Sequence, residues 1–313
     1  MYYLTVFSFL MITLLSFSLV FYSYSLAEPI KAAIITFDDG MLTQYTYAKP
    51  ILDKYNFKAT FYIICNSVDK ENRMNWNNIQ TLEEEEHEIG SHSMTHKRLS
   101  TLSEEEIRYE IIEAKRCLQE KGFNVTSFSF PYNDGDNNKN ILKIVADNYY
   151  IARTASEPLM LFQCRSENGE NNNNNNNNND DDYDDDNDDK YENQCHNQYS
   201  TENNENELQL DFKRYTITGL SHEAYKKSGG YSDKEMFEQF IEIVKSQTKY
   251  NTENSIGAIP ILIYHSVDYT GDDYSINPNL FEKEMEYLFE NGYKIFQMKD
   301  IVYDNEGLHI KGY

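Results

Sequence analysis

Short apolar segments alternate with amphipathic segments along most of this 313-residue chain. Runs rich in Ile, Val, Phe and Tyr that are bounded by turn residues are typical of buried strands. We expect strands at residues 31–37, 58–65, 87–91, 125–130, 149–153, 211–217, 258–264 and 293–297. The segment at 258–264 is apolar throughout, as in a strand that is buried on both faces.

Helical periodicity separates these strands. Residues 44–55, 79–86 and 140–148 are predicted helices, and further helices begin near Ser103, Ser232 and Pro278. Each of the two serines is followed three residues later by a glutamate, which is the spacing of a capping box, and proline is favoured in a first turn. The helix after Ser232 should turn one apolar stripe to the core: Phe237, Phe240, Ile241 and Val244.

Strands that alternate with helices indicate an α/β fold with a mostly parallel sheet, either open or closed into a barrel. In barrels the active site lies at the carboxyl ends of the strands. Several residues with useful chemistry follow the predicted strands at such ends: Asp38, Asp39, His92, Pro131, Tyr132 and His265.

The adjacent carboxylates Asp38 and Asp39 follow the first predicted strand and precede Gly40. Side chains alternate along a strand and the pattern breaks at its end, so one carboxylate can hold a metal while the other holds a water. His92 and His96 lie four residues apart after the third predicted strand. A carboxylate and two imidazoles suit zinc or a similar divalent ion with open coordination positions.

His265 follows the apolar segment 258–264, a position that favours an active-site acid or base. A third metal ligand and a core histidine are the alternatives. Residues 128–132, FSFPY, would bring a backbone N–H beside the metal, and such a donor can hold a developing oxyanion.

The sequence assigns no catalytic role to the remaining histidines or to the cysteines. His87 lies in an acidic run and is expected to be exposed, as are His222 and His309, which have no motif. Cys65 and Cys117 are interpreted as small buried hydrophobic residues. Cys164 and Cys195 flank an Asn/Asp tract and could close it with a disulfide, although the sequence does not fix the pairing.

Composition marks two segments outside the folded part. Residues 165–207 contain an unbroken asparagine run and acidic clusters, so we expect a disordered insertion there. The net charge of −24 argues against nucleic acid or an anionic membrane surface as a partner.

Residues 1–27 are apolar and end in SLA at 25–27, which predicts a cleaved signal peptide or, if retained, a membrane anchor. Either reading places the folded part outside the cytoplasm, secreted or at the cell surface.

The motifs resemble those of the polysaccharide deacetylase family, also called the NodB-homology domain or carbohydrate esterase family four. TFDDG at 36–40 is similar to the first family motif and SHSMTH at 91–96 to the second. SFPY at 129–132 is similar to part of the third, and LIYH at 262–265 to the late motif that ends in histidine. The resemblance covers about residues 31–303, interrupted by 165–207, and implies a distorted, incomplete β/α barrel.

The resemblance also implies roles for these residues. Asp38 would be the general base, Tyr132 the oxyanion donor through its backbone N–H, and His265 the general acid. The metal ligands would be Asp39, His92 and His96.

Two departures from the family pattern concern the residues around that base. The arginine that orients the base in the third motif is replaced by Ser129, and the Asp-x-x-Asp-Trp motif is missing, because the only tryptophan is Trp76. Arg153 is a candidate to replace one of these, and Pro131 and Arg153 are candidate orienting or substrate-binding residues.

The resemblance implies a metal-dependent hydrolase that removes N-acetyl groups from an N-acetylglucosamine-type polysaccharide. Zinc is the expected ion, with cobalt or nickel as alternatives. The departures leave two other functions open: a glycan-binding protein that has lost turnover, and an O-acetyl esterase that uses the same site.

Overall fold

The computed structural model describes residues 28–157, 159–162, 212–221, 230–304 and 307–313. The predicted leader at 1–27 and the predicted disordered insertion at 165–207 lie outside the described residues, as do His222 and the candidate Cys164–Cys195 pair. Among the helices that are described, none combines the length and the apolar character that a membrane crossing requires.

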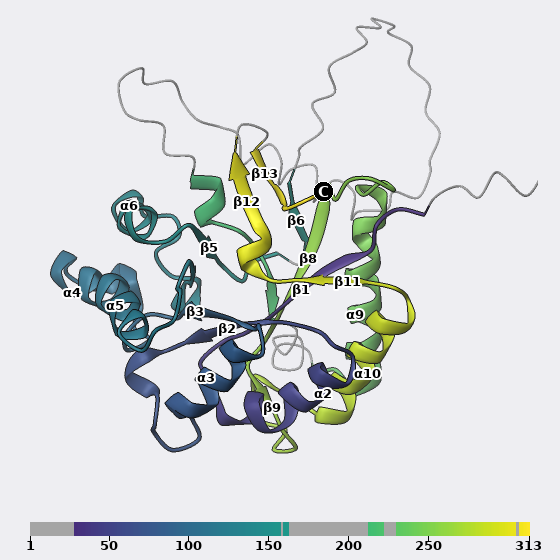
Figure 1. The fold of residues 1–313 in the computed structure, drawn as a ribbon, viewed down its shortest axis with the longest axis horizontal. Helices are drawn as coiled ribbons and strands as arrows, with labels where there is room; N and C mark the ends of the chain where they lie inside the picture. The colour runs from purple at the N-terminus through teal and green to yellow at the C-terminus, as the bar shows by residue number, and fades with distance from the viewer. Residues whose placement is uncertain (1–27, 158, 163–211, 222–229, 305–306) are drawn as a thin grey trace, which may run out of the picture.

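A curled, mostly parallel sheet forms the centre of the molecule (Figure 1). On one side of β1 (Ala32–Phe37) lie β2 (Thr60–Ile63), β3 (Glu88–Ser91), β4 (Ser127–Ser129) and β5 (Ile151–Arg153). On the other side lies β8 (Ala258–Tyr264), which also pairs with β7 (Leu220–Ser221) and, antiparallel, with β6 (Leu159–Leu161). The start of β1 pairs with β11 (Lys294–Phe296). The predicted α/β fold, a distorted and incomplete barrel, is confirmed.

Helices cover the outer side of the sheet. At the β3–β5 side lie α4 (Glu104–Arg108), α5 (Ala114–Gln119) and α6 (Lys139–Asn148), whereas α9 (Asp233–Ser246) and α10 (Pro278–Glu290) lie at the β8 side (Figure 1). The short helices α2 (Lys49–Lys54) and α3 (Trp76–Glu84) follow β1 and β2. Both predicted capping boxes are present, at Ser103 and Ser232.

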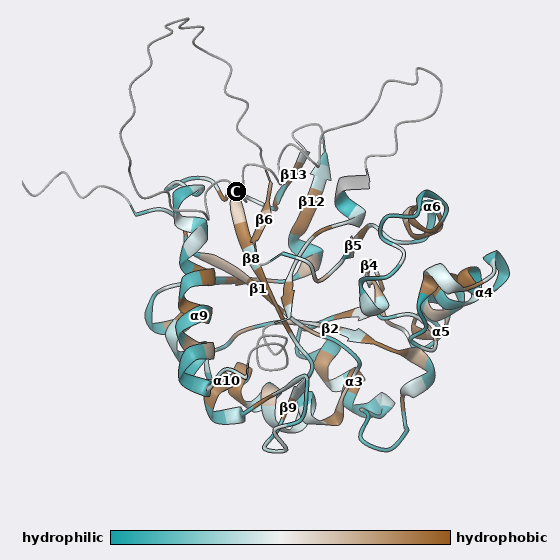
Figure 2. Ribbon diagram, turned by 180° about the vertical axis from the view of Figure 1, so that it is seen from behind, coloured by the Kyte–Doolittle hydropathy of each residue, from teal (hydrophilic) through white to brown (hydrophobic). Residues whose placement is uncertain are grey.

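Two apolar clusters hold the sheet. Along β1, Ala33, Ile35 and Phe37 pack with the helices, whereas Ala32 and Ile34 line the inner side of the curl, as the alternation of side chains along a strand requires. The hairpin of β12 (Ile301–Asp304) and β13 (Gly307–Ile310) adds to the inner cluster. Hydrophobic residues accordingly lie along the strands, and the outward sides of the helices are hydrophilic (Figure 2).

Most predicted helices and strands are found, but the strand expected at 211–217 is wrong. Phe212–Tyr215 form a 3-10 turn, and only Ile217 makes a bridge, to Arg153. The apolar positions there bury side chains, because Tyr215 and Ile217 are both in the core, without forming a ladder. The strand pair β9 (Ser266–Val267) and β10 (Ser275–Ile276) was not anticipated, since two-residue strands are too short for a period to show.

The predicted exposure of His87 is also wrong. His87 is buried, and its Nδ1 accepts a hydrogen bond from the Ala59 N–H at 3.1 Å. The acidic run ends with α3, and the following turn brings His87 inward immediately before β3.

Cys65 and Cys117 form a disulfide, which corrects their interpretation as separate hydrophobic residues. The bridge joins the segment after β2 to α5 across 52 residues of sequence. The Cys65 N–H also donates to the carbonyl of Ser93 at 3.4 Å. The disulfide therefore lies directly beside the loop that carries His96.

Candidate active site

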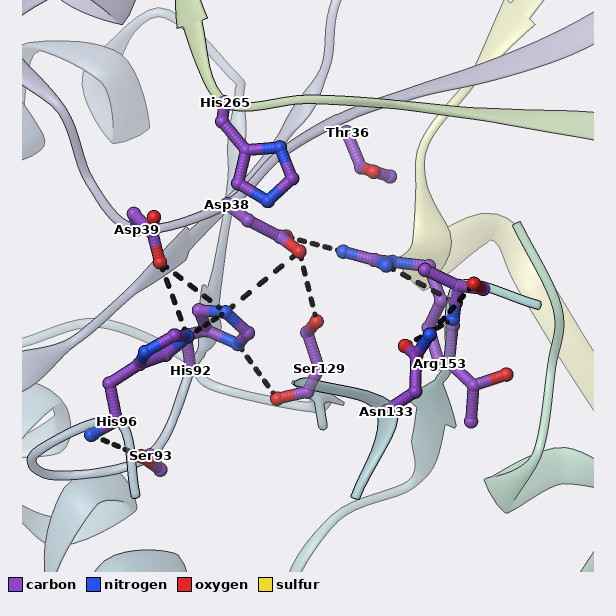
Figure 3. A network of polar contacts seen from close by, with 12 residues as sticks. Thr36, Asp38, Asp39, His92, Ser93, His96, Ser129, Asn133, Arg153 and His265 are labelled. Carbon is purple, nitrogen blue, oxygen red and sulfur yellow. Dashed lines mark hydrogen bonds and ion pairs between the residues drawn. The ribbon is translucent and has the colours of Figure 1, made fainter. Parts of the chain in front are cut away.

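The carboxyl ends of the parallel strands bring the predicted site residues together (Figure 3). Asp38 and Asp39 follow β1, and Asp39 takes a left-handed backbone conformation with φ 75°. His92 follows β3, and His265 follows β8. The break in strand geometry at Asp39 sends the two carboxylates in different directions, as the sequence predicts.

Asp39, His92 and His96 point their ligand atoms at one another. The Asp39 Oδ1 atom lies 3.6 Å from His92 Nε2 and 3.4 Å from His96 Nε2, and the two Nε2 atoms are 3.2 Å apart. Asp39 Oδ1 is buried and has no hydrogen-bond partner among the described residues. A buried oxygen without a partner beside two imidazole nitrogens fits a divalent cation.

Contacts behind the histidines fix their orientation. The Nδ1 of His92 lies 2.8 Å from the carbonyl oxygen of Ser129, so Nδ1 is the donor and the lone pair of Nε2 faces the site. Burial, followed by the neighbouring His92, lowers the pKa of His96 to about 4, so this ring is neutral, as a metal ligand must be.

The loop that carries His96 is held from η4 (Tyr109–Glu113), the helical turn that follows α4. The buried carboxylate of Glu110 accepts from the Thr95 N–H at 2.7 Å and from the Thr95 hydroxyl. His96 itself has φ 61°, and its N–H donates to Ser93 Oγ at 2.9 Å. Sequence reasoning missed Glu110, because nothing in a regular helix pattern marks a carboxylate that turns inward.

Asp38 forms a buried ion pair with Arg153, the last residue of β5. Arg153 is 1% exposed and Asp38 5%, and Ser129 Oγ donates to the second oxygen of Asp38 at 3.4 Å. Burial is the largest influence on the pKa of Asp38 and raises it, but Arg153 and the nearby histidines outweigh burial and lower the pKa overall. Arg153, the candidate to replace one of the two missing family features, therefore contacts the carboxylate of Asp38 directly.

His265 lies beside Asp38 on the side opposite Ser129 (Figure 3). Its backbone carbonyl accepts from Gln44 Nε2 at 2.9 Å, and the same amide donates to the carbonyl of Asp38. Gln44 is fully buried and thus joins the ends of β1 and β8. The sequence identified Gln44 only as the start of a helix, since a buried amide is recognised from its partners.

Tyr132 follows Pro131 after β4 and has φ 58°. Its ring lies 4.5 Å from the ring of His96, and its side chain is 54% exposed. The ring of Tyr132 thus lies beside the metal-ligand cluster.

A second group of ligand-type side chains needs no metal. Asp53, Glu85 and His87 cluster on the outer side, but Lys49 Nζ lies 2.7 Å from Asp53 and 2.5 Å from Glu85. Since the Ala59 N–H donates to Nδ1 of His87, the proton of the neutral ring lies on Nε2, which then has no lone pair for a metal. The ammonium group of Lys49 is the cation that the carboxylates of Asp53 and Glu85 contact.

Comparison with known proteins finds a family resemblance in the first half of the chain. The family model for polysaccharide deacetylase matches residues 26–151. Residues 26–151 are thus similar to the polysaccharide deacetylase family. The matched segment contains Asp38, Asp39, His92, His96 and Tyr132, whereas Arg153 and His265 lie beyond its end, so their placement rests on the geometry above.

Curated deacetylases resemble part of this chain. A peptidoglycan-N-acetylglucosamine deacetylase of Bacillus cereus is 32% identical over 102 residues, which are 31% of this chain and 35% of that protein. A protein of the same name from Listeria monocytogenes is 31% identical over 108 residues, 34% of this chain and 22% of the relative. The chain thus matches well under half of the length of these relatives.

Solved structures of deacetylases share the fold. A peptidoglycan N-acetylglucosamine deacetylase in complex with an N-oxidanyl-benzamide has a TM-score of 0.51 at 15% identity, covering 86% of both chains. A mutant of a CE4 family pseudoenzyme with restored enzymatic activity has a TM-score of 0.50 at 17% identity, covering 86% of this chain and 66% of that one. At these identities the likeness concerns the fold alone.

Proposed function

We propose that this protein is a metal-dependent hydrolase that removes N-acetyl groups from an N-acetylglucosamine-type polysaccharide. One observation carries the proposal: the neighbouring carboxylates have different partners. Asp39 faces two imidazoles across a gap that suits a cation, whereas Asp38 is paired with Arg153. A ligand and a separate base are what metal-assisted hydrolysis requires.

Asp39, His92 and His96 would hold the ion. Three protein ligands with positions left open are typical of catalytic zinc, and cobalt or nickel accept the same nitrogen and oxygen donors. When bound, such an ion supplies Lewis-acid chemistry toward an acyl carbonyl and a lowered pKa for water.

The chain's own groups would perform the proton transfers. Asp38, kept ionised by Arg153, accepts the proton of the attacking water. The Tyr132 N–H donates to the oxyanion that develops on the former carbonyl oxygen. His265 then gives a proton to the nitrogen of the sugar amine as the C–N bond breaks, so that acetate and the amine leave.

The location is proposed with the function. The apolar segment before Glu28 supports export to the outside of the cell or to its surface. The Cys65–Cys117 disulfide supports the same location, because disulfides persist in oxidising compartments.

Acetate release from N-acetylglucosamine oligomers tests the proposal. We expect release by protein loaded with zinc, cobalt or nickel, and loss of release in the presence of a chelator. Release from O-acetylated xylan alone would instead indicate the O-acetyl esterase. If metal-loaded protein released no acetate from any N- or O-acetylated glycan, the glycan-binding alternative would replace the enzyme.

A change of Arg153 to Gln should lower kcat by about 10- to 100-fold, which is less than the roughly 100- to 10,000-fold that general-base catalysis contributes, because the base itself is kept. The change removes the main group that lowers the pKa of Asp38, so that pKa rises. A base works when it is deprotonated, and the acidic limb of the pH–kcat profile should therefore move to higher pH.

Ser129→Ala is the matched control for this change, because it removes the longer and weaker contact to the same carboxylate. It should leave the acidic limb in place. Thermal unfolding of both variants separates a loss of the base from a loss of the fold, since the glutamine leaves Asp38 without its counter-ion. An unshifted acidic limb in folded Arg153→Gln would contradict the orienting role.

A further inference from the structure

We infer that the Cys65–Cys117 disulfide positions the metal ligand His96, so that the protein reaches its full metal affinity only after the disulfide has formed. The inference rests on the proposed metal centre of Asp39, His92 and His96. It adds a covalent clamp behind one of the three ligands. The disulfide itself lies outside the centre and acts on the loop that presents His96.

The two imidazole ligands are supported in different ways. The N–H of His92 donates to the carbonyl of Ile63 at 2.9 Å, and the carbonyl of Ser129 fixes its ring, so His92 is held by neighbouring strands of the sheet. His96 lies further along, in the loop after β3, and its side chain is 22% exposed, compared with 3% for His92. The position of His96 therefore depends on what holds this loop.

The loop has a backbone conformation that its surroundings must impose. Ser93 has φ 63° and His96 has φ 61°, and residues other than glycine rarely adopt this left-handed conformation. Such residues persist where the surrounding structure over-determines them. The hydroxyl of Ser93 accepts from the His96 N–H, a bond that lies within the loop (Figure 3). Two neighbouring segments attach the loop to the rest of the fold.

The first of these segments begins at Cys65. It is the short turn η2 (Cys65–Ser67), which follows β2. The Cys65 N–H donates to the carbonyl of Ser93 at 3.4 Å, and the Asn66 N–H donates to the carbonyl of Met94 at 3.0 Å. Two consecutive residues thus donate to two consecutive carbonyls of the loop.

The second segment is the helix that carries Cys117. The carbonyl of Glu110 accepts from the Met94 N–H at 3.0 Å, and its buried carboxylate accepts from the Thr95 N–H at 2.7 Å. Glu110 belongs to η4, a turn of the wide π type, which often occurs at functional sites. This turn continues directly into α5, the helix of Cys117.

The disulfide joins the two segments into one frame around the loop. It fixes η2 against α5, so the hydrogen bonds from Cys65 and from Glu110 reach the loop from a constant separation. Without the crosslink the two segments can move apart, and the left-handed residues Ser93 and His96 can relax. Partners that orient a metal ligand contribute about 10- to 100-fold to metal affinity. A crosslink that acts through the loop should contribute about tenfold, at the lower end of that range.

The clamp also makes metal affinity dependent on oxidation. Disulfide formation by exchange with a donor disulfide transfers two electrons and two protons from the cysteine thiols to the donor, which is released as a dithiol. A compartment that supplies such donors completes the frame. A compartment that keeps thiols reduced leaves His96 less firmly held.

The zinc affinity of a Cys65→Ala/Cys117→Ala double variant tests the inference, because alanine removes the crosslink and leaves no thiol to bind zinc. We expect the dissociation constant, measured by competition with a chromophoric chelator, to rise by about tenfold. Leu288→Ala is the matched control. Leu288 is fully buried in α10, and its truncation destabilises a fold about as much as the loss of a disulfide. Its zinc affinity should equal that of the wild type, although its unfolding temperature falls.

Amide hydrogen exchange of the metal-free wild type gives a second readout, which needs neither zinc nor turnover. Reduction with a phosphine breaks the S–S bond, oxidises the phosphine to its oxide with the oxygen of a water molecule, and leaves both cysteines as thiols. The amides of Thr95 and His96 should then exchange about tenfold faster. The amides of β8 should stay protected, which shows that the fold is intact.

The outcomes separate this inference from the proposed function. Wild-type zinc affinity in the folded double variant would overturn the positioning role. An equal loss of affinity in Leu288→Ala would also overturn it, because the effect would then be general destabilisation. Unchanged exchange of the Thr95 and His96 amides after reduction would show that the disulfide does not hold the loop. A wild type that bound no zinc would overturn the proposed metal centre, whereas faster exchange of the loop amides would still support the clamp.

Discussion

Asp38→Asn is expected to slow acetate release by about 1,000-fold while the protein still binds one divalent ion, because the amide cannot accept a proton from water. The substitution preserves the shape of the side chain, and the amide oxygen can still accept from Arg153. The carboxylate oxygens of Asp38 are not among the atoms that converge on the candidate ion position. Its Oδ2 lies 3.9 Å from His92 Nε2, and its other oxygen faces Arg153.

Metal content and turnover are measured on the same preparation of Asp38→Asn. Elemental analysis after dialysis gives the stoichiometry, and a coupled acetate assay gives the rate. Normal turnover would show that the base has been assigned to the wrong residue. Loss of the ion together with activity would show that Asp38 is a ligand, and the separation of roles between the two carboxylates would be incorrect.

Asp39→Ala is expected to lose metal and activity together. Two imidazoles would remain, and the dissociation constant should rise by more than about 100-fold, because loss of even an indirect partner of a metal ligand costs 10- to 100-fold in affinity. Titration with zinc in the presence of a competing chelator measures this change directly and does not depend on turnover.

Asp53→Ala provides the matched control, since Asp53 also lies in a cluster of potential ligands but is paired with Lys49. It should leave zinc affinity unchanged. If Asp39→Ala bound zinc as tightly as the wild type, the ion would have to be held by other groups, and the candidate centre would be wrong.

Local pattern was enough to predict the core of this fold. The apolar segment at 258–264 predicts β8 with its observed bounds, and the capping boxes at Ser103 and Ser232 predict where two helices begin. The grouping of the candidate site residues could be predicted because parallel strands deliver their carboxyl ends to one edge, so a residue that follows a strand is already placed.

What could not be predicted depends on contacts between distant segments. Cys65 and Cys117 can pair because the fold brings them close together, and their spacing in the sequence does not reveal that closeness. Arg153 could be named as a candidate, but its partner is known only once β5 and β1 lie in the same curl. Glu110 and Gln44 support the site through buried hydrogen bonds, which leave no periodic signal.

The different partners of Asp38 and Asp39 also determine how the proposed metal site would behave without an ion. Arg153 is a permanent counter-ion for Asp38, because a guanidinium stays charged at any physiological pH. The counter-ion of Asp39 would be exchangeable. Removing it would leave one uncompensated carboxylate at the more exposed of the two positions, where water reaches part of the side chain although Oδ1 itself is buried. The protein would thus be able to fold first and take up its metal afterwards.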